Sequence, residues 1–344
     1  MRTFSRSNFL FLSLGLFLLF LIPTVCWFLF VPPSKTSSTK VVFIKKGTSL
    51  KKASEILQEE GVIKNKNFFV LLATVLGKKT KVRAGEYEFN TQMLPLEILE
   101  SLVRGQAKRR LVTIPEGYTL SQIAQLLEDL NIVERKSFLQ KASSPAFIST
   151  LGLAPSEIPT LEGYLFPDTY HLFREMDPEE VIQVMMNQFK KVFGPDLANR
   201  ASELGISPRE AVILASIIEK ETSLPEEKPL ISSVFHNRLR KKIPLQSDPT
   251  VIYGIRNFNG NLTKEDLMRP TPYNTYLISG LPPTPICNPG KDSLLAAVHP
   301  APVPYLYFVS KNDGSHFFSS DFEEHNRAVW KYQKDSKKNG LTKR

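Results

Sequence analysis

Two glutamates at the end of one apolar segment are the residues best suited to acid–base chemistry. A helix is predicted to begin at Pro208, with Ser207 as its N-cap and Glu210 completing a capping box. Eight uncharged residues follow, a pattern typical of a buried helix. Glu219 and Glu221 then close the helix. A carboxyl there either pairs with a cation or keeps its proton near neutral pH, as a general acid must.

Helical geometry does not choose between these two glutamates. They lie about 200° apart around a helix axis, so they cannot face the same site. Glu219 shares a face with Ser216, whereas Glu221 lies over Ile217. Both could also be surface charges at a helix end, which is the commoner situation for glutamate.

An internal repeat lies upstream of this helix. Residues 41–50 recur as residues 111–120, with Gly47 and Gly117 in matching places. Each copy predicts a strand, a glycine turn and an amphipathic helix, which ends near Gly61 in the first copy. A second short helix is expected after each, at 65–76 and 135–141. Thr48 and Thr119 are the expected caps of the two longer helices. A strand over 82–89 and a helix over 94–104 are predicted between the copies.

The second copy resembles a LysM module. The resemblance is carried by residues 114–124, Ile-Pro-Glu-Gly-Tyr-Thr-Leu-Ser-Gln-Ile-Ala. The first copy departs further, with Lys51-Lys52-Ala53 at the start of its helix. Because LysM modules bind glycans that contain N-acetylglucosamine, the resemblance implies a glycan-facing role. Whether either copy binds sugar stays open at this point.

The N-terminal residues predict a membrane anchor. The run 9–31 carries no charge and would span about 34 Å as a helix, enough for a ~30 Å hydrocarbon core. Arg2 and Arg6 precede it, which places the N-terminus in the cytoplasm and the remaining chain outside. A cleaved signal peptide is the alternative, but no small-residue cleavage site follows. We therefore expect a single-pass membrane protein with its N-terminus in the cytoplasm and the bulk of the chain outside.

Together these patterns predict an α+β protein with one transmembrane helix, LysM-like βα subdomains and a larger α+β catalytic domain. The predicted divisions are a cytoplasmic stub at 1–8, the anchor at 9–31, a linker at 32–40, the first repeat with its following strand and helix at 41–110, the second repeat at 111–155, the catalytic domain at 156–334 and a basic tail at 335–344.

The segments after residue 160 resemble those of the YceG-like endolytic murein transglycosylases. The helix end Ile-Ile-Glu-Lys-Glu-Thr at 217–222 resembles the active-site segment of that family. Further matching segments follow in family order, at 161–170, 234–239, 245–253, 273–276, 280–283, 288–290, 299–300, 305–309 and 325–326. The resemblance covers about residues 41–333. Cys287 departs from the pattern, since it replaces a small residue.

This resemblance implies cleavage of peptidoglycan between N-acetylmuramic acid and N-acetylglucosamine, with a 1,6-anhydro end as product. By the family's pattern Glu219 is the catalytic acid. One carboxyl suffices, because the muramoyl 6-hydroxyl is the nucleophile. Six polar residues are the expected substrate-binding residues: Asn237, Gln246, Ser247, Asp248, Tyr273 and Asn274. Asp248 could instead act as the second carboxylate of a hydrolase, although an Asp before Pro249 is usually a turn residue.

Other functions are less well supported by the residues. The alternative to an enzyme is a non-catalytic peptidoglycan-binding scaffold of the wall-synthesis machinery. The formal charge of +10 also suits nucleic acid or anionic lipid, but no nucleic-acid-binding motif is present and no nucleic-acid partner is expected. The histidines lack metal-ligand spacing, so neither a metal nor a cofactor is expected. Peptidoglycan strands, and synthases or other division proteins, are the expected partners.

Overall fold

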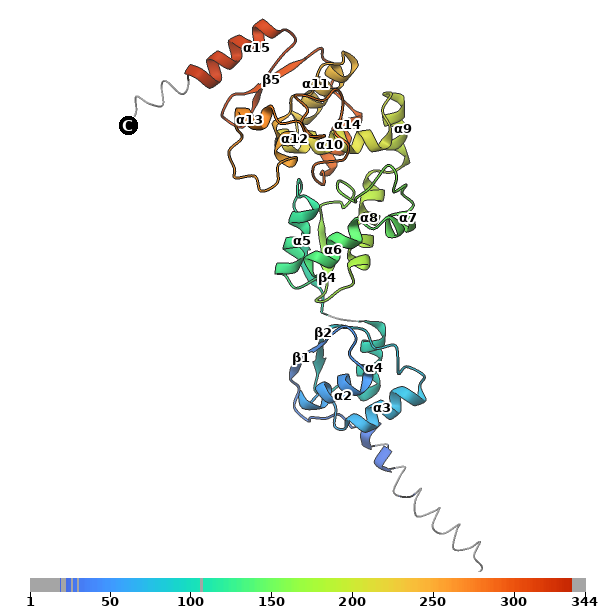
Figure 1. Ribbon diagram of the computed structural model, residues 1–344. Helices are drawn as coiled ribbons and strands as arrows, with labels where there is room; N and C mark the ends of the chain where they lie inside the picture. Colours follow the sequence, from blue (N-terminus) through green and yellow to red (C-terminus); the bar gives the residue numbers. More distant parts are fainter. Residues whose placement is uncertain (1–18, 20–22, 26, 30, 106–107, 336–344) are drawn as a thin grey trace, which may run out of the picture. The chain divides into compact units, whose positions relative to one another are not determined.

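The computed structural model describes residues 19, 23–25, 27–29, 31–105 and 108–335, and it divides into two compact units (Figure 1). The first unit holds the described residues up to Leu111, together with Leu130–Ile132 and His171–Met176. The second unit holds Val112–Asp129, Val133–Tyr170 and the described residues from Asp177 onward. Helices and strands both contribute, which confirms the α+β class.

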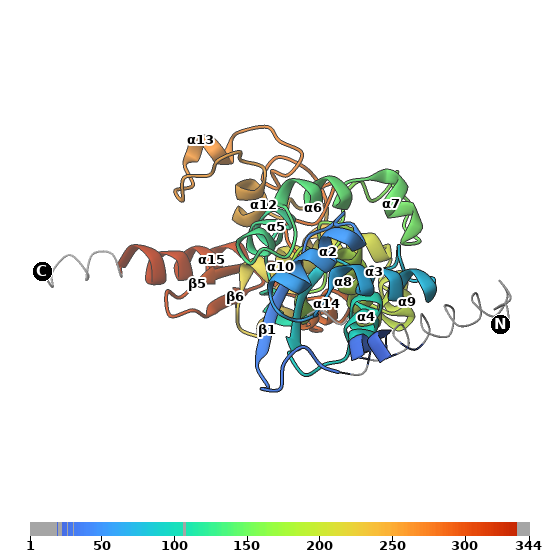
Figure 2. The same ribbon diagram turned by 90° about the horizontal axis from the view of Figure 1, so that it is seen from below.

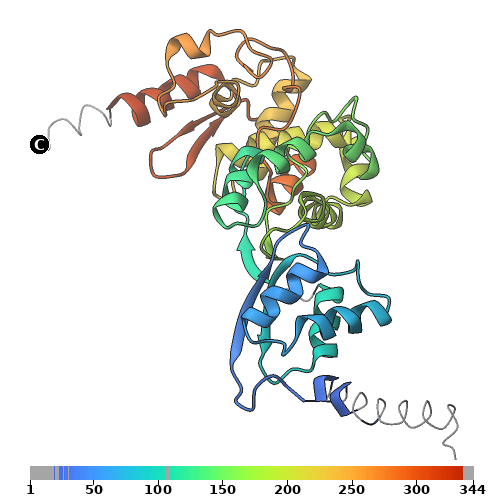
Figure 3. The same cartoon turned by 60° about the horizontal axis from the view of Figure 1, so that its bottom comes forward.

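The first unit is built on a two-stranded antiparallel sheet and the helices that pack with it. Its elements are β1 (Thr39–Ile44), α2 (Leu50–Glu59), α3 (Lys66–Val75), β2 (Gly85–Asn90) and α4 (Pro95–Arg104). In the sheet Val42 pairs with Tyr87. Figure 3 shows α2 beside this sheet, and α2 contacts both β1 and α3. Their apolar faces and both strands form one buried core, which includes Leu57, Phe69 and Leu102.

The second repeat begins with the same order as the first, a strand followed by two helices. Its elements are β3 (Arg110–Thr113), α5 (Leu120–Asp129), α6 (Arg135–Ala142), α7 (Pro145–Thr150) and β4 (Thr169–Leu172), with β3 paired to β4. The predicted strand and helix pattern is therefore confirmed in both copies. Thr119 accepts a hydrogen bond from the Gln122 N–H at the start of α5, as expected of a cap. In the first copy the cap is Ser49, not Thr48, because Ser49 Oγ accepts from the Lys52 N–H.

The rest of the second unit is mainly helical. Its elements are α8 (Pro178–Val192), α9 (Pro195–Glu203), α10 (Pro208–Glu221), α11 (Lys228–Arg240), α12 (Asp248–Tyr253), α13 (Lys264–Leu267), α14 (Lys291–Val298), β5 (Tyr307–Ser310), β6 (His316–Ser319), α15 (Phe322–Val329) and the π-helix η1 (Trp330–Asp335). Helix α10 contacts α9, α11, α12 and α14. The antiparallel β5–β6 hairpin contacts α15, beside which it lies in Figure 2.

Three sequence predictions concern the ends and divisions of the chain. The stub 1–8 and most of the anchor 9–31 lie outside the described residues, as do residues 336–344 of the tail. Within the part of the chain that the structure describes, no helix is both long and apolar enough to cross a bilayer. The predicted boundary between 155 and 156 lies inside the second compact unit, which begins at Val112.

Candidate active site

Helix α10 carries both glutamates and forms where the sequence predicts it. The Ser207 hydroxyl accepts a hydrogen bond from the Glu210 N–H, and the Glu210 carboxylate accepts from the Ser207 N–H. All residues from 211 to 218 are buried, so this part of the helix is surrounded by the rest of the protein on every side. The last turn of this fixed core helix presents two carboxyls to different surroundings.

Glu219 is enclosed by donors from two other helices. Its Oε2 atom lies 3.2 Å from Nζ of Lys228, and it accepts hydrogen bonds from the Gly290 N–H at 3.0 Å and the Ser293 hydroxyl at 2.6 Å. The Glu219 and Lys228 side chains are 8% and 4% exposed. Gly290 and Ser293 form the N-cap and first turn of α14, whose positive end favours a carboxylate. Glu219 therefore joins α10 to α11 and α14.

The glycine turn of the second repeat lies against the same end of α10. Gly117 has a φ of +74°, and a Cβ there would lie 3.6 Å from Cγ of Glu219. The Gly117 carbonyl accepts a hydrogen bond from Lys220 Nζ at 3.4 Å. Next to it, burial and the charge of Glu219 raise the pKa of Glu116. The end of α10 near Glu219 is thus closed by the second repeat.

Glu221 has different surroundings, formed by the segment before α12. The Ser247 hydroxyl donates a short hydrogen bond to Oε1 of Glu221. Burial raises the pKa of Glu221 to about 7, and the nearby charge of Asp248 acts in the same direction. The Ser247 hydrogen bond and the charge of Arg238 oppose this shift only in part. Glu221 is therefore a carboxyl that carries a proton in a large fraction of molecules at neutral pH.

A cleft of about 370 Å³ opens beside Glu221. Its lining residues are Glu221, Arg238, Leu245, Gln246, Asp248, Tyr276, Phe308, Val309, Ser310, His316, His325, Val329 and Gln333. They come from α10, α11, the segment before α12 and the first residue of α12, the segment between α13 and α14, the β5–β6 hairpin, α15 and η1. Polar and charged side chains supply more than half of them, which suits a ligand rich in hydroxyl and amide groups.

Two of the six predicted substrate-binding residues line this cleft, and a third contacts the Glu221 carboxyl. Gln246 lines it with a φ of +52°, a left-handed conformation that is uncommon outside glycine. Asp248 lines it at the first position of α12 and accepts a hydrogen bond of 2.6 Å from the Tyr276 hydroxyl. Ser247 is buried and makes the bond to Glu221. The structure brings these three together with Glu221.

The other three predicted residues use their polar atoms to hold the backbone or a neighbouring side chain. The Asn237 side-chain amide donates to the carbonyls of Val303 and Tyr305, both at 2.9 Å. The fully buried Asn274 amide donates to two carbonyls of the segment before it. The Tyr273 hydroxyl is bonded to that of Thr284. None of the three lines the cleft, and Glu219 does not line it either.

Arg238, Tyr276 and His325 line the cleft without having been singled out from the sequence. Arg238 is almost fully buried and donates to the carbonyls of Leu245 and Leu306, so it fixes the cleft wall. The His325 ring stacks on Tyr307. All three lie in segments that carry the family resemblance. That resemblance is therefore the feature of the sequence that could have identified them as residues of the site.

A second buried carboxyl lies outside the cleft. Burial raises the pKa of Glu162 to about 7, against the effect of three hydrogen-bond donors. The donors are the Leu120 N–H, the Tyr253 hydroxyl and the Asn288 amide. Glu162 therefore links the start of α5 to the end of α12, and it contacts no cleft residue in these bonds. Within the described ranges no group of three or more His, Cys, Asp or Glu side chains could hold a metal ion.

The fold and the cleft define a class of protein: an α+β chain whose polar cleft presents a partly buried carboxyl with a raised pKa. Residues 42–331 match the YceG-like family, which is most of the chain. The protein therefore belongs to the YceG-like family, and the resemblance noted in its sequence is confirmed.

Individual relatives agree with this assignment. A Bacillus subtilis protein named endolytic murein transglycosylase is 34% identical over 316 residues, which cover 88% of this chain and 87% of the relative. A Streptococcus pneumoniae protein of the same name is 30% identical, and the match covers 86% of this chain and 59% of that protein. The crystal structure of a YceG-like protein from Listeria monocytogenes aligns with a TM-score of 0.59 and 31% identity, covering 85% of this chain and 99% of that one.

Proposed function

We propose that this protein is a peptidoglycan lytic transglycosylase and that Glu221 is its acid and base. The observation that carries the proposal is the Glu221 carboxyl, which faces a polar cleft with a pKa of about 7. The names of the relatives supply the substrate, murein. The bond cleaved is that between N-acetylmuramic acid and N-acetylglucosamine.

Glu221 suits this role better than Glu219, which the sequence resemblance favoured. A general acid must reach the leaving oxygen of its substrate, and only a group that borders the cleft can do so. Glu221 borders it, whereas the Oε2 atom of Glu219 is occupied by Lys228, Gly290 and Ser293. We therefore move the catalytic assignment by two residues and give Glu219 a structural role.

The reaction needs one carboxyl and no water. Glu221 first donates its proton to the glycosidic oxygen, so the bond from that oxygen to muramoyl C1 breaks and N-acetylglucosamine leaves as an alcohol. The muramoyl 6-hydroxyl then attacks C1, and the Glu221 carboxylate takes its proton. The ring that closes is the 1,6-anhydro end, and the enzyme recovers its protonated carboxyl. Because the nucleophile belongs to the sugar itself, its effective concentration is high.

Digestion of purified sacculi tests both the reaction and the residue. The wild-type chain is compared with Glu221→Gln and Glu219→Gln, and the products are analysed by mass. We expect anhydro-muramoyl ends from the wild type, a loss of at least about a hundredfold for Glu221→Gln, and a smaller loss for Glu219→Gln. Reducing ends in place of anhydro ends would identify a hydrolase, with Asp248 as the candidate second carboxylate. Equal yields from wild type and Glu221→Gln would reject Glu221.

We also propose that residues 9–31 anchor the enzyme in the cytoplasmic membrane, with the catalytic unit outside. The apolar run and the preceding arginines support this orientation. An anchored enzyme reaches only glycan close to the membrane, where new strands are made. We therefore infer that it terminates nascent strands beside the synthases, which would be its partners. A scaffold without activity is the alternative, and the same digestion excludes or supports it.

A further inference from the structure

Helix α3 has two apolar faces, and the protein core covers only one of them. Phe69 and Ala73 point into the core of the first unit and are fully buried. Phe68, Leu71, Leu72 and Val75 form a second stripe at the i, i+3, i+4, i+7 spacing of one helix face. Phe68 and Leu72 are partly buried, and Leu72 also packs against the edge of the core. Leu71 is 55% exposed and Val75 is 76% exposed. Leu71 and Val75 therefore leave an apolar part of the stripe open to solvent, and an exposed apolar patch marks a site of interaction.

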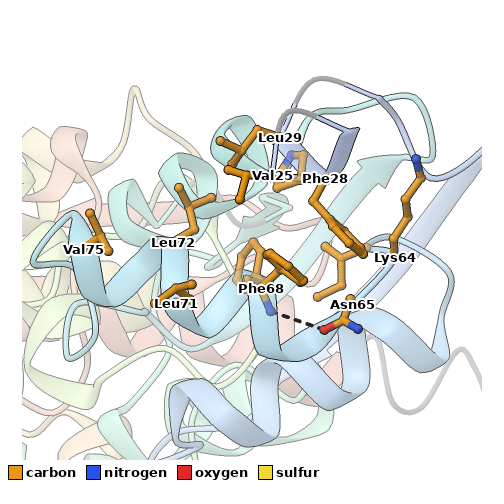
Figure 4. A pocket seen from close by; sticks show the side chains of 12 residues that line it. Val25, Phe28, Leu29, Lys64, Asn65, Phe68, Leu71, Leu72 and Val75 are labelled. Atoms are coloured by element: carbon orange, nitrogen blue, oxygen red, sulfur yellow. Dashed lines mark hydrogen bonds between the residues drawn. The ribbon is translucent and has the colours of Figure 1, made fainter. Parts of the chain in front are cut away.

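The end of the predicted anchor lies on this second stripe. Val25, Phe28 and Leu29 line a groove of about 180 Å³ together with the stripe (Figure 4). The rings of Phe28 and Phe68 stack with their centroids 4.1 Å apart. Nζ of Lys64, just before α3, lies 3.6 Å from the centre of the half-exposed Trp27 ring. A half-exposed tryptophan with a neighbouring lysine is typical of a membrane–water interface.

The length of the apolar run shows that a membrane span must include the residues that line this groove. As a helix, residues 9–22 would span only about 21 Å, which is too short for a ~30 Å hydrocarbon core. The span therefore needs residues near Val25 and Phe28, which are the residues that contact α3. If the run crosses the membrane, the stripe on α3 meets the same membrane.

The charges around α3 agree with an anionic surface. Four of the six residues from 78 to 83 are basic, and they follow directly after the exposed end of the helix. Lys79 is exposed. An exposed apolar stripe bordered by lysines and arginines is the pattern of a helix that lies in the head-group region of anionic lipids.

We propose that the α3 stripe (Phe68, Leu71, Leu72 and Val75) inserts into the outer leaflet of the membrane that holds the anchor, so that the first unit is seated on the lipid rather than tethered above it. This inference rests on the proposed anchoring and adds to it a second contact with lipid. The partner is the bilayer, with anionic head groups beside residues 78–83.

Brominated lipids test this contact with the full chain in vesicles of phosphatidylcholine and phosphatidylglycerol. Both native tryptophans are first replaced, by Trp27→Phe and Trp330→Phe. One variant then carries Val75→Trp on the stripe. The matched control carries Val184→Trp, because Val184 is also an exposed valine, on α8 in the second unit. We expect bromines near the head groups to quench most of the emission at position 75 and to leave position 184 unchanged.

Three outcomes overturn the inference and can be told apart. Equal, weak quenching at both positions, in a chain that stays in the vesicles after an alkaline carbonate wash, would reject lipid contact by α3 but keep the anchor. A chain that the wash removes would reject the anchor itself. A dimer that Leu71→Glu dissociates, without quenching at position 75, would assign the stripe to a second copy of the chain.

Discussion

At the scale of single residues, the proposed activity of the cleft depends on one carboxyl, Glu221, whose pKa is raised. Burial and the charge of Asp248 raise the pKa of Glu221 from an ordinary value near 4.5 to about 7. The raised pKa keeps the acidic form populated at neutral pH while the conjugate base stays accessible. A single group that first gives and later takes a proton works best when its pKa is near the working pH.

The pH dependence of activity should therefore report Glu221. Only the protonated form can donate to the glycosidic oxygen, so kcat/KM is expected to fall above a midpoint near pH 7, by about tenfold per further pH unit. Initial rates on purified glycan strands across this range provide the measurement. The control Glu162→Gln removes the other carboxyl whose pKa is about 7, outside the cleft, and should leave the midpoint in place. A rate that stays constant up to pH 9 would contradict this role.

The charge of Asp248 should set part of that midpoint. Because the negative charge raises the pKa of Glu221, Asp248→Asn is expected to move the alkaline midpoint to lower pH, whatever it does to the maximal rate. Asp266→Asn is the matched control, since it removes the same charge in α13 and outside the cleft. The profiles of both variants are compared with that of the wild type. A midpoint that moves upward or not at all in Asp248→Asn would argue against the coupling.

The sequence narrowed the candidate acid to two glutamates in one helix turn and did not distinguish between them. The apolar run and the capping box indicated a buried helix ending in Glu219 and Glu221, and that helix is present. The two glutamates differ in their tertiary contacts. Glu219 contacts Lys228 and Ser293. Glu221 lies beside Ser247 and Asp248. These contacts join residues far apart in sequence, so no local pattern could assign them. The backbone carbonyls that Asn237 and Asn274 bind are likewise not indicated by any local pattern.

At the scale of elements, the sequence predicted those helices whose ends and faces are determined by neighbouring residues. Capping residues, glycine turns and helical periodicity predicted α2, α3, α5 and α6 in both repeats and the ends of α4 and α10. The pairing of β3 with β4 was not predicted, because β4 lies far beyond the expected end of the repeat. The helices of the second copy and the residues that line the cleft belong to the same compact unit.

The buried contact between α10, α11 and α14 should contribute strongly to stability. Glu219→Gln leaves the Lys228 ammonium buried without a carboxylate, and breaking a buried ion pair in this way costs about 3–5 kcal/mol. We expect a clear drop in the midpoint of thermal unfolding for Glu219→Gln. The double variant Glu219→Gln, Lys228→Met removes the unpaired charge and should recover part of the loss. A single variant as stable as the wild type would show that solvent compensates the pair.

At the scale of the whole molecule, the chain combines a cleft, two repeated units and an apolar N-terminal run. The cleft lies within the second unit, and the stripe of α3 lies within the first. In the sequence the predicted anchor comes first, then the first unit, then the residues of the cleft. The proposed catalytic group is therefore joined to the membrane through the first unit. The proposed restriction to nascent strands follows from this order and not from any property of the cleft.

Release from the membrane should therefore change where the enzyme cuts and not whether it cuts. Replacing residues 1–31 by a cleavable export signal frees the chain. On purified sacculi the freed chain is expected to match the anchored one, because Glu221 and its cleft are unaltered. In a bacterium that lacks its own YceG-like enzyme, the full chain should restore the length distribution of glycan strands, measured by chromatography, whereas the freed chain should not. Freed chain with Glu221→Gln serves as the inactive control, and full restoration by the active freed chain would mean that proximity to the membrane does not govern strand length.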